Sequence, residues 1–151
     1  MVRRSDPSYA APPPRAVLAA IAAALVLAVA VLYAPVRTHA FLLFDDAEYV
    51  TDNPPVRAGL TLDGVRWALT HSHSANWHPL TWMSHMADVS VWGMNAGGHL
   101  LVNVAFHAAN AVLVFLVLHA MTGALWPSAA VAALFALHPL RVESVAWVSE
   151  R

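Results

Sequence analysis

The sequence predicts an all-α membrane protein with about three membrane-spanning helices and a long loop between the first two. Of its 151 residues, 59% are hydrophobic and 11% are charged, and the mean hydropathy is +0.56. Soluble domains usually carry about 25% charged residues. The apolar residues also gather in long runs without charge, which is typical of helices that cross a bilayer. We therefore expect the lipid bilayer as a partner and no separate soluble domain.

The composition excludes several classes of site and partner. The chain has no cysteine, which rules out disulfides, thiolate nucleophiles and cysteine-ligated zinc. Its formal net charge of −1 leaves no basic surface of the kind that binds nucleic acid. We accordingly expect no nucleic-acid partner.

The first apolar run, residues 16–33, is about 18 residues long, which suffices for a membrane span. Residues 1–15 are polar and proline-rich, and are expected to be disordered. A signal peptide cleaved near residues 38–40 is the alternative. The run is longer than the usual apolar core of a signal peptide, which favours a helix that stays in the chain.

Arginine placement predicts the orientation of this first span. Arg3, Arg4 and Arg15 precede it, and only Arg37 follows closely. Because positive charge is retained on the cytoplasmic side, the N-terminus is expected in the cytoplasm and the loop 34–97 outside.

Two further apolar runs, 99–121 and 126–140, complete the predicted membrane region. Gly123 is a stop signal between them, and Pro127 suits the first turn of the next helix. The third run is short for a span and is also compatible with a re-entrant segment. If all three runs cross, the residues after 140 return to the same side of the membrane as the outer loop.

The outer loop 34–97 is expected to contain short helices. Residues 52–55 read as a turn. Thr61 or Asp63 can cap a short helix over residues 62–70, which would lie either in the membrane interface or within a folded loop.

An acidic stretch near the start of this loop is the leading candidate for catalysis. Asp45, Asp46 and Glu48 fall within four positions of a chain with few charges. A carboxylate in a partly dry site can act as a general base toward a hydroxyl. In an extended segment the two adjacent aspartates would point to opposite faces, so that one meets a substrate and the other orients it. The alternative is a solvated turn or helix cap.

Trp77 and His78 are candidate substrate contacts in the same loop. Trp77 suits either an interfacial aromatic belt or a platform on which a sugar stacks, and the belt is favoured. His78 precedes a proline that restricts the backbone, although an ordinary loop histidine explains it equally well. The histidines of this loop do not define four ligands, so no metal site is predicted. A metal-binding or ion-handling membrane protein, built on these histidines and on the stripe from His99 to Asn110, is a weaker third hypothesis.

A polar stripe runs along the second predicted span. His99, Asn103, His107 and Asn110 fall within about 80° of one another at 100° per residue. Such a stripe must face protein or water. Hydrogen bonding between helices is the favoured explanation, and His99, at the outer end, is the member best placed to reach a site.

His138, Arg141 and Glu143 follow the third apolar run. A guanidinium group can bind phosphate or carboxylate in a bidentate manner. Arg141 is therefore a candidate ligand for a substrate phosphate, and an ion pair with Glu143 is the alternative.

Several motifs together resemble a known family. They are the acidic stretch at 44–50, the string Asn-Trp-His-Pro-Leu-Thr-Trp at 76–82, and the string His-Pro-Leu-Arg-Val-Glu-Ser-Val-Ala-Trp at 138–147. Over residues 41–151 the chain resembles the N-terminal membrane region of bacterial tetratricopeptide-repeat (TPR) membrane proteins. Those proteins are similar to the transmembrane O-mannosyltransferases that carry TPR repeats (the TMTC family), in the GT-C superfamily.

The resemblance implies a glycosyltransferase that moves a sugar, with mannose as the candidate, from a polyprenyl-phosphate donor to a protein hydroxyl outside the cytoplasm. It implies Asp45 as the base, Asp46 in support, and His138 and Arg141 on the lipid phosphate. No metal or other cofactor is expected. The family adds further helices and a TPR region that are absent from these residues, so we expect an N-terminal part, inactive alone, of a bacterial inner-membrane protein. The alternative is a non-catalytic membrane anchor or scaffold.

Overall fold

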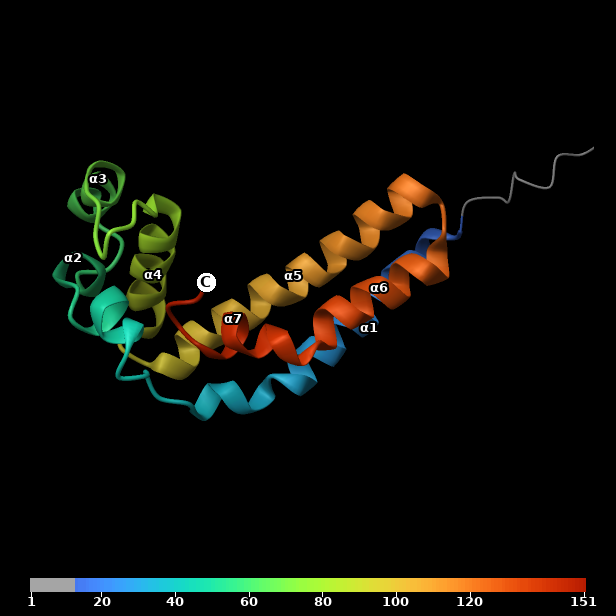
Figure 1. Cartoon of the computed structure of the whole chain (residues 1–151), viewed down its shortest axis with the longest axis horizontal. Coiled ribbons are helices and arrows are strands. Elements are labelled where there is room, and N and C mark those ends of the chain that lie inside the picture. The colour runs from blue at the N-terminus through green and yellow to red at the C-terminus, as the bar shows by residue number, and fades with distance from the viewer. Residues whose placement is uncertain (1–12) are drawn as a thin grey trace, which may run out of the picture.

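The computed structural model describes residues 13–151, and these residues contain no β-strand (Figure 1). The predicted all-α fold is confirmed. Most of the expected disordered segment, residues 1–12, lies outside the described residues. The longer helices are α1 (Arg15–Leu32), α3 (Leu62–Thr70), α4 (Pro79–Trp92), α5 (Ala96–Thr122) and α6 (Leu125–Leu137). The short helical turns are η1 (Ala34–Thr38), η2 (Ala47–Thr51), α2 (Pro54–Arg57), η3 (Pro139–Arg141) and α7 (Val142–Ala146).

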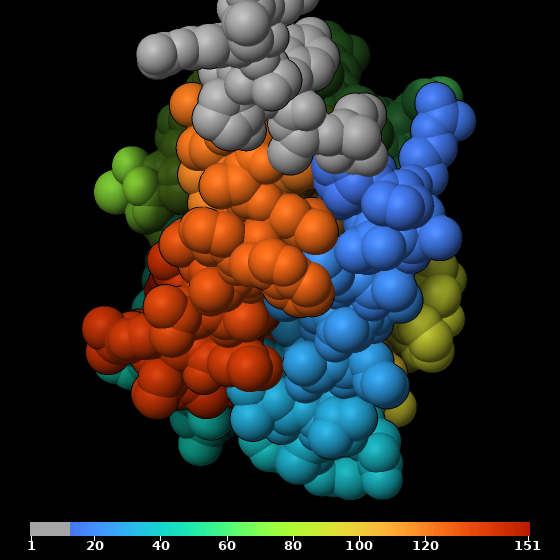
Figure 2. Space-filling model, turned by 90° about the vertical axis from the view of Figure 1, so that its right-hand side faces the viewer, coloured from blue at the N-terminus to red at the C-terminus, as the bar shows by residue number. Residues whose placement is uncertain are grey.

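Three long helices form the membrane layer. α5 packs against α1 and α6, and α1 and α6 lie side by side on one face (Figure 2). α1 and α5, with 18 and 27 residues, are long and apolar enough to cross a membrane. At 1.5 Å per residue α5 is about 40 Å long, more than the hydrocarbon core of a bilayer requires. Many large apolar side chains on these helices are exposed, as contact with lipid demands.

The third predicted span is bent. α6 is 13 residues long and ends at His138, where the chain turns by 55° into η3 and α7. α6 is too short to cross a membrane alone, but α6 together with η3 and α7 is long and apolar enough to form one bent span. The protein therefore has two membrane-spanning candidates, or three with the bent pair. Pro139 explains the break, since the residue before a proline disfavours helical backbone.

α1 is an integral part of the core. Leu25, Val29 and Tyr33 are buried on its inner side, and the Tyr33 ring meets the edge of His107 on α5 with 5.7 Å between centroids. These contacts hold α1 against α5.

The start of α5 approaches the backbone after α1 very closely. A Cβ atom at Gly97 would lie 2.1 Å from the carbonyl oxygen of Arg37, so only glycine fits there. At the other end, Gly123 ends α5 in the left-handed conformation with φ of 69°, as expected from its position as a stop signal.

The segment from η2 to α4, which we call the outer unit, lies at one end of α5 (Figure 1). Thr61 caps α3 as predicted, with its Oγ1 accepting from the Gly64 amide at 3.0 Å. α4 was not predicted. Its buried side includes His85 and Asp88 as well as Trp82 and Met86, and this mixture hides the apolar periodicity that normally indicates a helix.

Candidate functional site

The acidic stretch folds as a helical turn and not as an extended segment, with Asp46 at φ −61° and ψ −30°. Asp46 is 1% exposed. Its Oδ2 accepts from the Leu42 amide and its Oδ1 from the Ser149 amide, each at 2.9 Å. Asp46 therefore ties the outer loop to the chain that follows α7.

Asp45 is only partly buried, and its side chain makes no hydrogen bond to another described residue. The ring of Phe44, its neighbour in sequence, lies near the ring of Trp147, with 5.9 Å between the centroids. A carboxylate without a partner, held beside a buried one, is free to accept a proton from a substrate hydroxyl.

The segment after α6 meets the acidic stretch through residues 147–149. His138, Arg141 and Glu143 are exposed, and none of them has an ion pair or hydrogen bond with Asp45 or Asp46 among residues 13–151. Within the same residues, Arg141 forms no ion pair with Glu143. The contact between these two segments is made instead by the Ser149 amide and Asp46.

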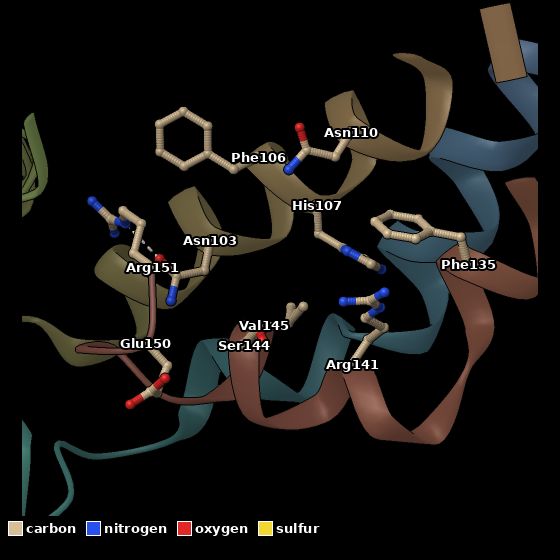
Figure 3. A pocket seen from close by; sticks show the side chains of 10 residues that line it. All are labelled: Asn103, Phe106, His107, Asn110, Phe135, Arg141, Ser144, Val145, Glu150 and Arg151. Carbon is tan, nitrogen blue, oxygen red and sulfur yellow. Dashed lines mark hydrogen bonds between the residues drawn. The ribbon is translucent and has the colours of Figure 1, made fainter. Parts of the chain in front are cut away.

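Arg141 lies over the ring of Phe135, 4.5 Å from its centroid, and faces a cavity of about 160 Å³ between α5 and α7 (Figure 3). The cavity also has Asn103, His107 and Arg151 in its wall. The Glu150 carboxylate lines it as well, and Arg151 is already paired with Asp88. Arg141, which has no ion pair among residues 13–151, is therefore the guanidinium in this wall that could meet an anion.

The polar stripe of α5 serves mainly to connect helices. Asn103 Nδ2 donates to the Trp147 carbonyl at 2.9 Å, and His107 Nε2 bonds the Ala136 carbonyl at 2.9 Å. These bonds agree with the favoured explanation of interhelical hydrogen bonding. Asn110 is exposed and lines the edge of the cavity.

Trp77 and His78 lie immediately before α4, whose first residue is Pro79. Trp77 is 59% exposed and its Nε1 donates to the Leu69 carbonyl at 3.2 Å. His78 is exposed and precedes the first residue of α4. Between residues 13 and 151, no hydrogen bond connects either side chain to Asp45.

A second polar group, not predicted from the sequence, is buried where α4 meets α5. His85, Asp88 and His99 are 0%, 4% and 0% exposed. Asp88 Oδ2 forms an ion pair with Arg151 at 2.5 Å and lies 3.6 Å from His99 Nδ1. His99 was predicted to reach a substrate, but the structure encloses it in this group. The spacing of His85 and Asp88, three residues apart, is the one local signal, since such residues share a helix face.

Arg151 organises this group through a full set of donors. Its Nε donates to Asn103 Oδ1 at 2.6 Å, one terminal nitrogen to Ser84 Oγ at 2.5 Å, and the other to the His99 carbonyl at 3.0 Å.

The pKa of Asp88 is raised by burial, an effect that Arg151 opposes. Burial, followed by the charges of Arg151 and His99, lowers the pKa of His85 to about 3, so His85 is neutral.

Comparison with known proteins gives a partial relationship. The chain is 38% identical over 80 residues to protein O-mannosyl-transferase Tmtc1 of Drosophila melanogaster. The match covers 53% of this chain and 9% of that protein, so the chain spans a small part of its relative. No protein-family model matches the chain, and no solved structure matches it. The match supports a partial relationship to that transferase.

Proposed function

We propose that these residues form the N-terminal part of a membrane glycosyltransferase that moves a sugar, with mannose as the candidate, from a polyprenyl-phosphate donor to a protein hydroxyl. The observation that carries the proposal is the bond from the Ser149 amide to Asp46, because it brings the acidic stretch and the segment after α6 to one end of the membrane layer. The partial similarity to an O-mannosyl-transferase supports the reaction class.

In the proposed reaction, Asp45 takes the proton of the acceptor hydroxyl as its oxygen attacks the anomeric carbon. The bond from that carbon to the donor phosphate breaks, and the phosphate leaves with the electron pair. Direct displacement inverts the configuration at the anomeric carbon. Asp46 holds the turn that presents Asp45, and its two amide bonds support that role.

Arg141 is the proposed ligand of the donor phosphate, where positive charge stabilises the leaving group. Its position in the wall of the cavity, with no ion pair to another residue in 13–151, supports this assignment. His138 and Glu143 are exposed nearby on the same segment and are proposed to contact the donor or to orient Arg141. Trp77 and His78 are exposed and available to an acceptor. We propose that protein groups carry the reaction without a divalent metal.

The arginines before α1 favour a cytoplasmic N-terminus and an active face on the periplasmic side of a bacterial inner membrane. In the complete protein, further helices and TPR repeats are proposed to enclose the donor and to bind the acceptor protein. A non-catalytic anchor for such repeats is the competing function.

The test is Asp45→Asn in the complete protein, assayed for sugar transfer from a polyprenyl-phosphate donor. Removing a general base is expected to lower the rate about 100-fold or more, with membrane insertion unchanged. Glu48→Gln, an exposed acid on the next turn, is the matched control and is expected to keep its activity. Transfer at the normal rate by Asp45→Asn would show that Asp45 is not the general base. A wild-type protein without transferase activity would favour the non-catalytic membrane anchor.

A further inference from the structure

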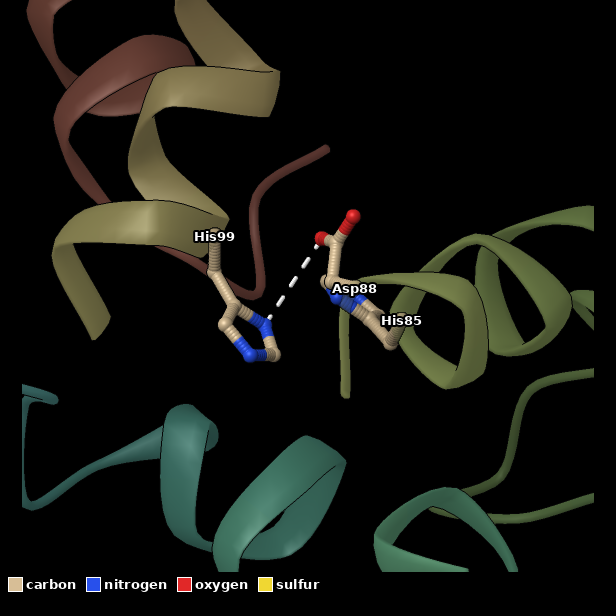
Figure 4. A group of neighbouring side chains, drawn as sticks. All are labelled: His85, Asp88 and His99. Atoms are coloured by element: carbon tan, nitrogen blue, oxygen red, sulfur yellow. Dashed lines mark ion pairs between the residues drawn. The ribbon is translucent and has the colours of Figure 1, made fainter. Parts of the chain in front are cut away.

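The buried group at the junction of α4 and α5 has the arrangement of a metal site. His85 and Asp88 project from one side of α4, and His99 faces them from the first turn of α5 (Figure 4). Each of the three offers one ligand atom, and these atoms all lie within 4.8 Å of one another. All three side chains are more than nine-tenths buried, so they are held in place by the surrounding fold.

The hydrogen bonding of His99 determines which of its nitrogens is free. Its Nε2 lies 2.9 Å from the Gly93 carbonyl, and a carbonyl oxygen only accepts, so Nε2 carries the proton. In the neutral ring, Nδ1 then presents a lone pair, and it points at Asp88 Oδ2, 3.6 Å away. Two electron-rich atoms face each other in a dry site, which is unfavourable unless a cation or a proton lies between them.

His85 distinguishes these two possibilities. Neither of its ring nitrogens has a hydrogen-bond partner, although the residue is fully buried. A proton on His99, together with Arg151, would balance Asp88 and still leave both His85 nitrogens unsatisfied. A metal ion would use a lone pair of His85 as well as those of His99 and Asp88.

The free ring nitrogens of the group suit a metal. Histidine binds metal through the lone pair of a neutral imidazole, and His85 and the Nδ1 of His99 have no hydrogen-bond partner that would occupy it. The Gly93 carbonyl orients His99, and Arg151 pairs with Oδ2 of Asp88, the same oxygen that faces His99. Such outer partners commonly hold the ligands of a metal site, although the positive charge of Arg151 will weaken the affinity for a cation.

The geometry points to a Zn²⁺ site formed by His85, Asp88 and His99, with a fourth position left for water. Two imidazoles and one carboxylate are a common zinc set, whereas Mg²⁺ and Ca²⁺ prefer oxygen ligands alone. Tetrahedral bonds of about 2.1 Å place ligand atoms about 3.4 Å apart, close to the 3.6 Å between His99 Nδ1 and Asp88 Oδ2. The ion would clamp the outer unit onto α5. This inference does not depend on the proposed glycosyl transfer.

The experiment measures Zn²⁺ binding by the purified chain in detergent micelles after treatment with a chelator. We expect one Zn²⁺ per chain, and we expect Co²⁺ in its place to give the strong visible absorption of a tetrahedral site. Replacing both histidines, His85→Gln with His99→Gln, is expected to weaken binding at least about tenfold and to abolish that absorption. His71→Gln, an exposed histidine outside the group, is the control and should bind as the wild type does.

Three results would overturn the site. One is less than half an equivalent of Zn²⁺ bound by the wild type, which would mean that the group holds only the ion pair of Asp88 and Arg151. Another is equal binding by the double variant, and the third is an equal loss in His71→Gln, which would indicate surface histidines. The Co²⁺ spectrum is recorded on the wild type, so it keeps the inference testable if the double variant does not fold.

Discussion

Asp46 and Asp88 are both buried carboxylates that hold the last described residues against the rest of the protein, but their partners differ. Asp46 accepts from two backbone amides, one at Leu42 and one at Ser149. Asp88 pairs with the guanidinium of Arg151 and lies beside two histidines with unused nitrogens. Neutral donors satisfy the carboxylate of Asp46. The carboxylate of Asp88 lies in a group that contains a charged guanidinium and histidine nitrogens without hydrogen-bond partners.

The difference separates a structural role from a binding role. Backbone amides do not change their charge and remain bonded to Asp46. Asp46 therefore fixes the position of the turn that carries Asp45. The two histidines beside Asp88 can accept a cation, because both keep lone pairs in a dry site. Buried acids of this second kind are the ones from which ligand sites are built.

The largest expected effect is the loss of Asp88. In Asp88→Ala the Arg151 guanidinium stays buried without its counter-charge, which typically costs about 3–5 kcal/mol. We expect this loss in the free energy of unfolding, measured by tryptophan fluorescence in mixed micelles. Asp63→Ala is the control, because Asp63 is exposed in the first turn of α3 and such a charge contributes about 0.3–1 kcal/mol. Equal losses in the two variants would mean that the buried pair contributes no more than a surface charge.

The loss of Asp46 should cost less, because its partners are neutral. Asp46→Ala leaves the amides of Leu42 and Ser149 without an acceptor, and we expect a loss of about 1–3 kcal/mol. Asp46→Asn keeps one acceptor oxygen and should lose about half as much. Hydrogen exchange at the Ser149 amide provides the local measurement, with faster exchange expected in both variants. Unchanged exchange in Asp46→Ala would show that the bond does not hold this segment.

The membrane layer could be predicted from the sequence because a span needs a long apolar run, and such runs exist at α1 and α5. The cap of α3 by Thr61 was predictable for a similar reason, since the signal is local. The acidic stretch was found by its charge, but its helical conformation was not, because the partner of Asp46 lies at Ser149, far along the chain.

The group around Asp88 could not have been found in this way. Its charged partner, Arg151, follows the third apolar run, and no spacing rule connects the two positions. α4 also buries His85 and Asp88 on the side where an apolar stripe was the expected signal. A site made by side chains from separate helices appears only when the tertiary structure brings those helices together.

The smallest expected effect concerns Ser84, whose hydroxyl accepts from Arg151 at the edge of the same group. Ser84→Ala removes one neutral partner while the ion pair with Asp88 and the bonds to Asn103 and His99 remain. We expect a loss of about 0.5–1.5 kcal/mol in the free energy of unfolding.

Ser72→Ala is the matched control for that measurement, because Ser72 is exposed in the loop before α4 and should change the unfolding free energy very little.

Added zinc tests which of these variants keeps the proposed metal site. If the ion holds α4 to α5, saturating Zn²⁺ should raise the stability of Ser84→Ala and of Asp46→Ala as much as that of the wild type, since both keep all three ligands. Asp88→Ala lacks one ligand and should gain less. An equal gain in Asp88→Ala would place the bound zinc somewhere other than the junction of α4 and α5.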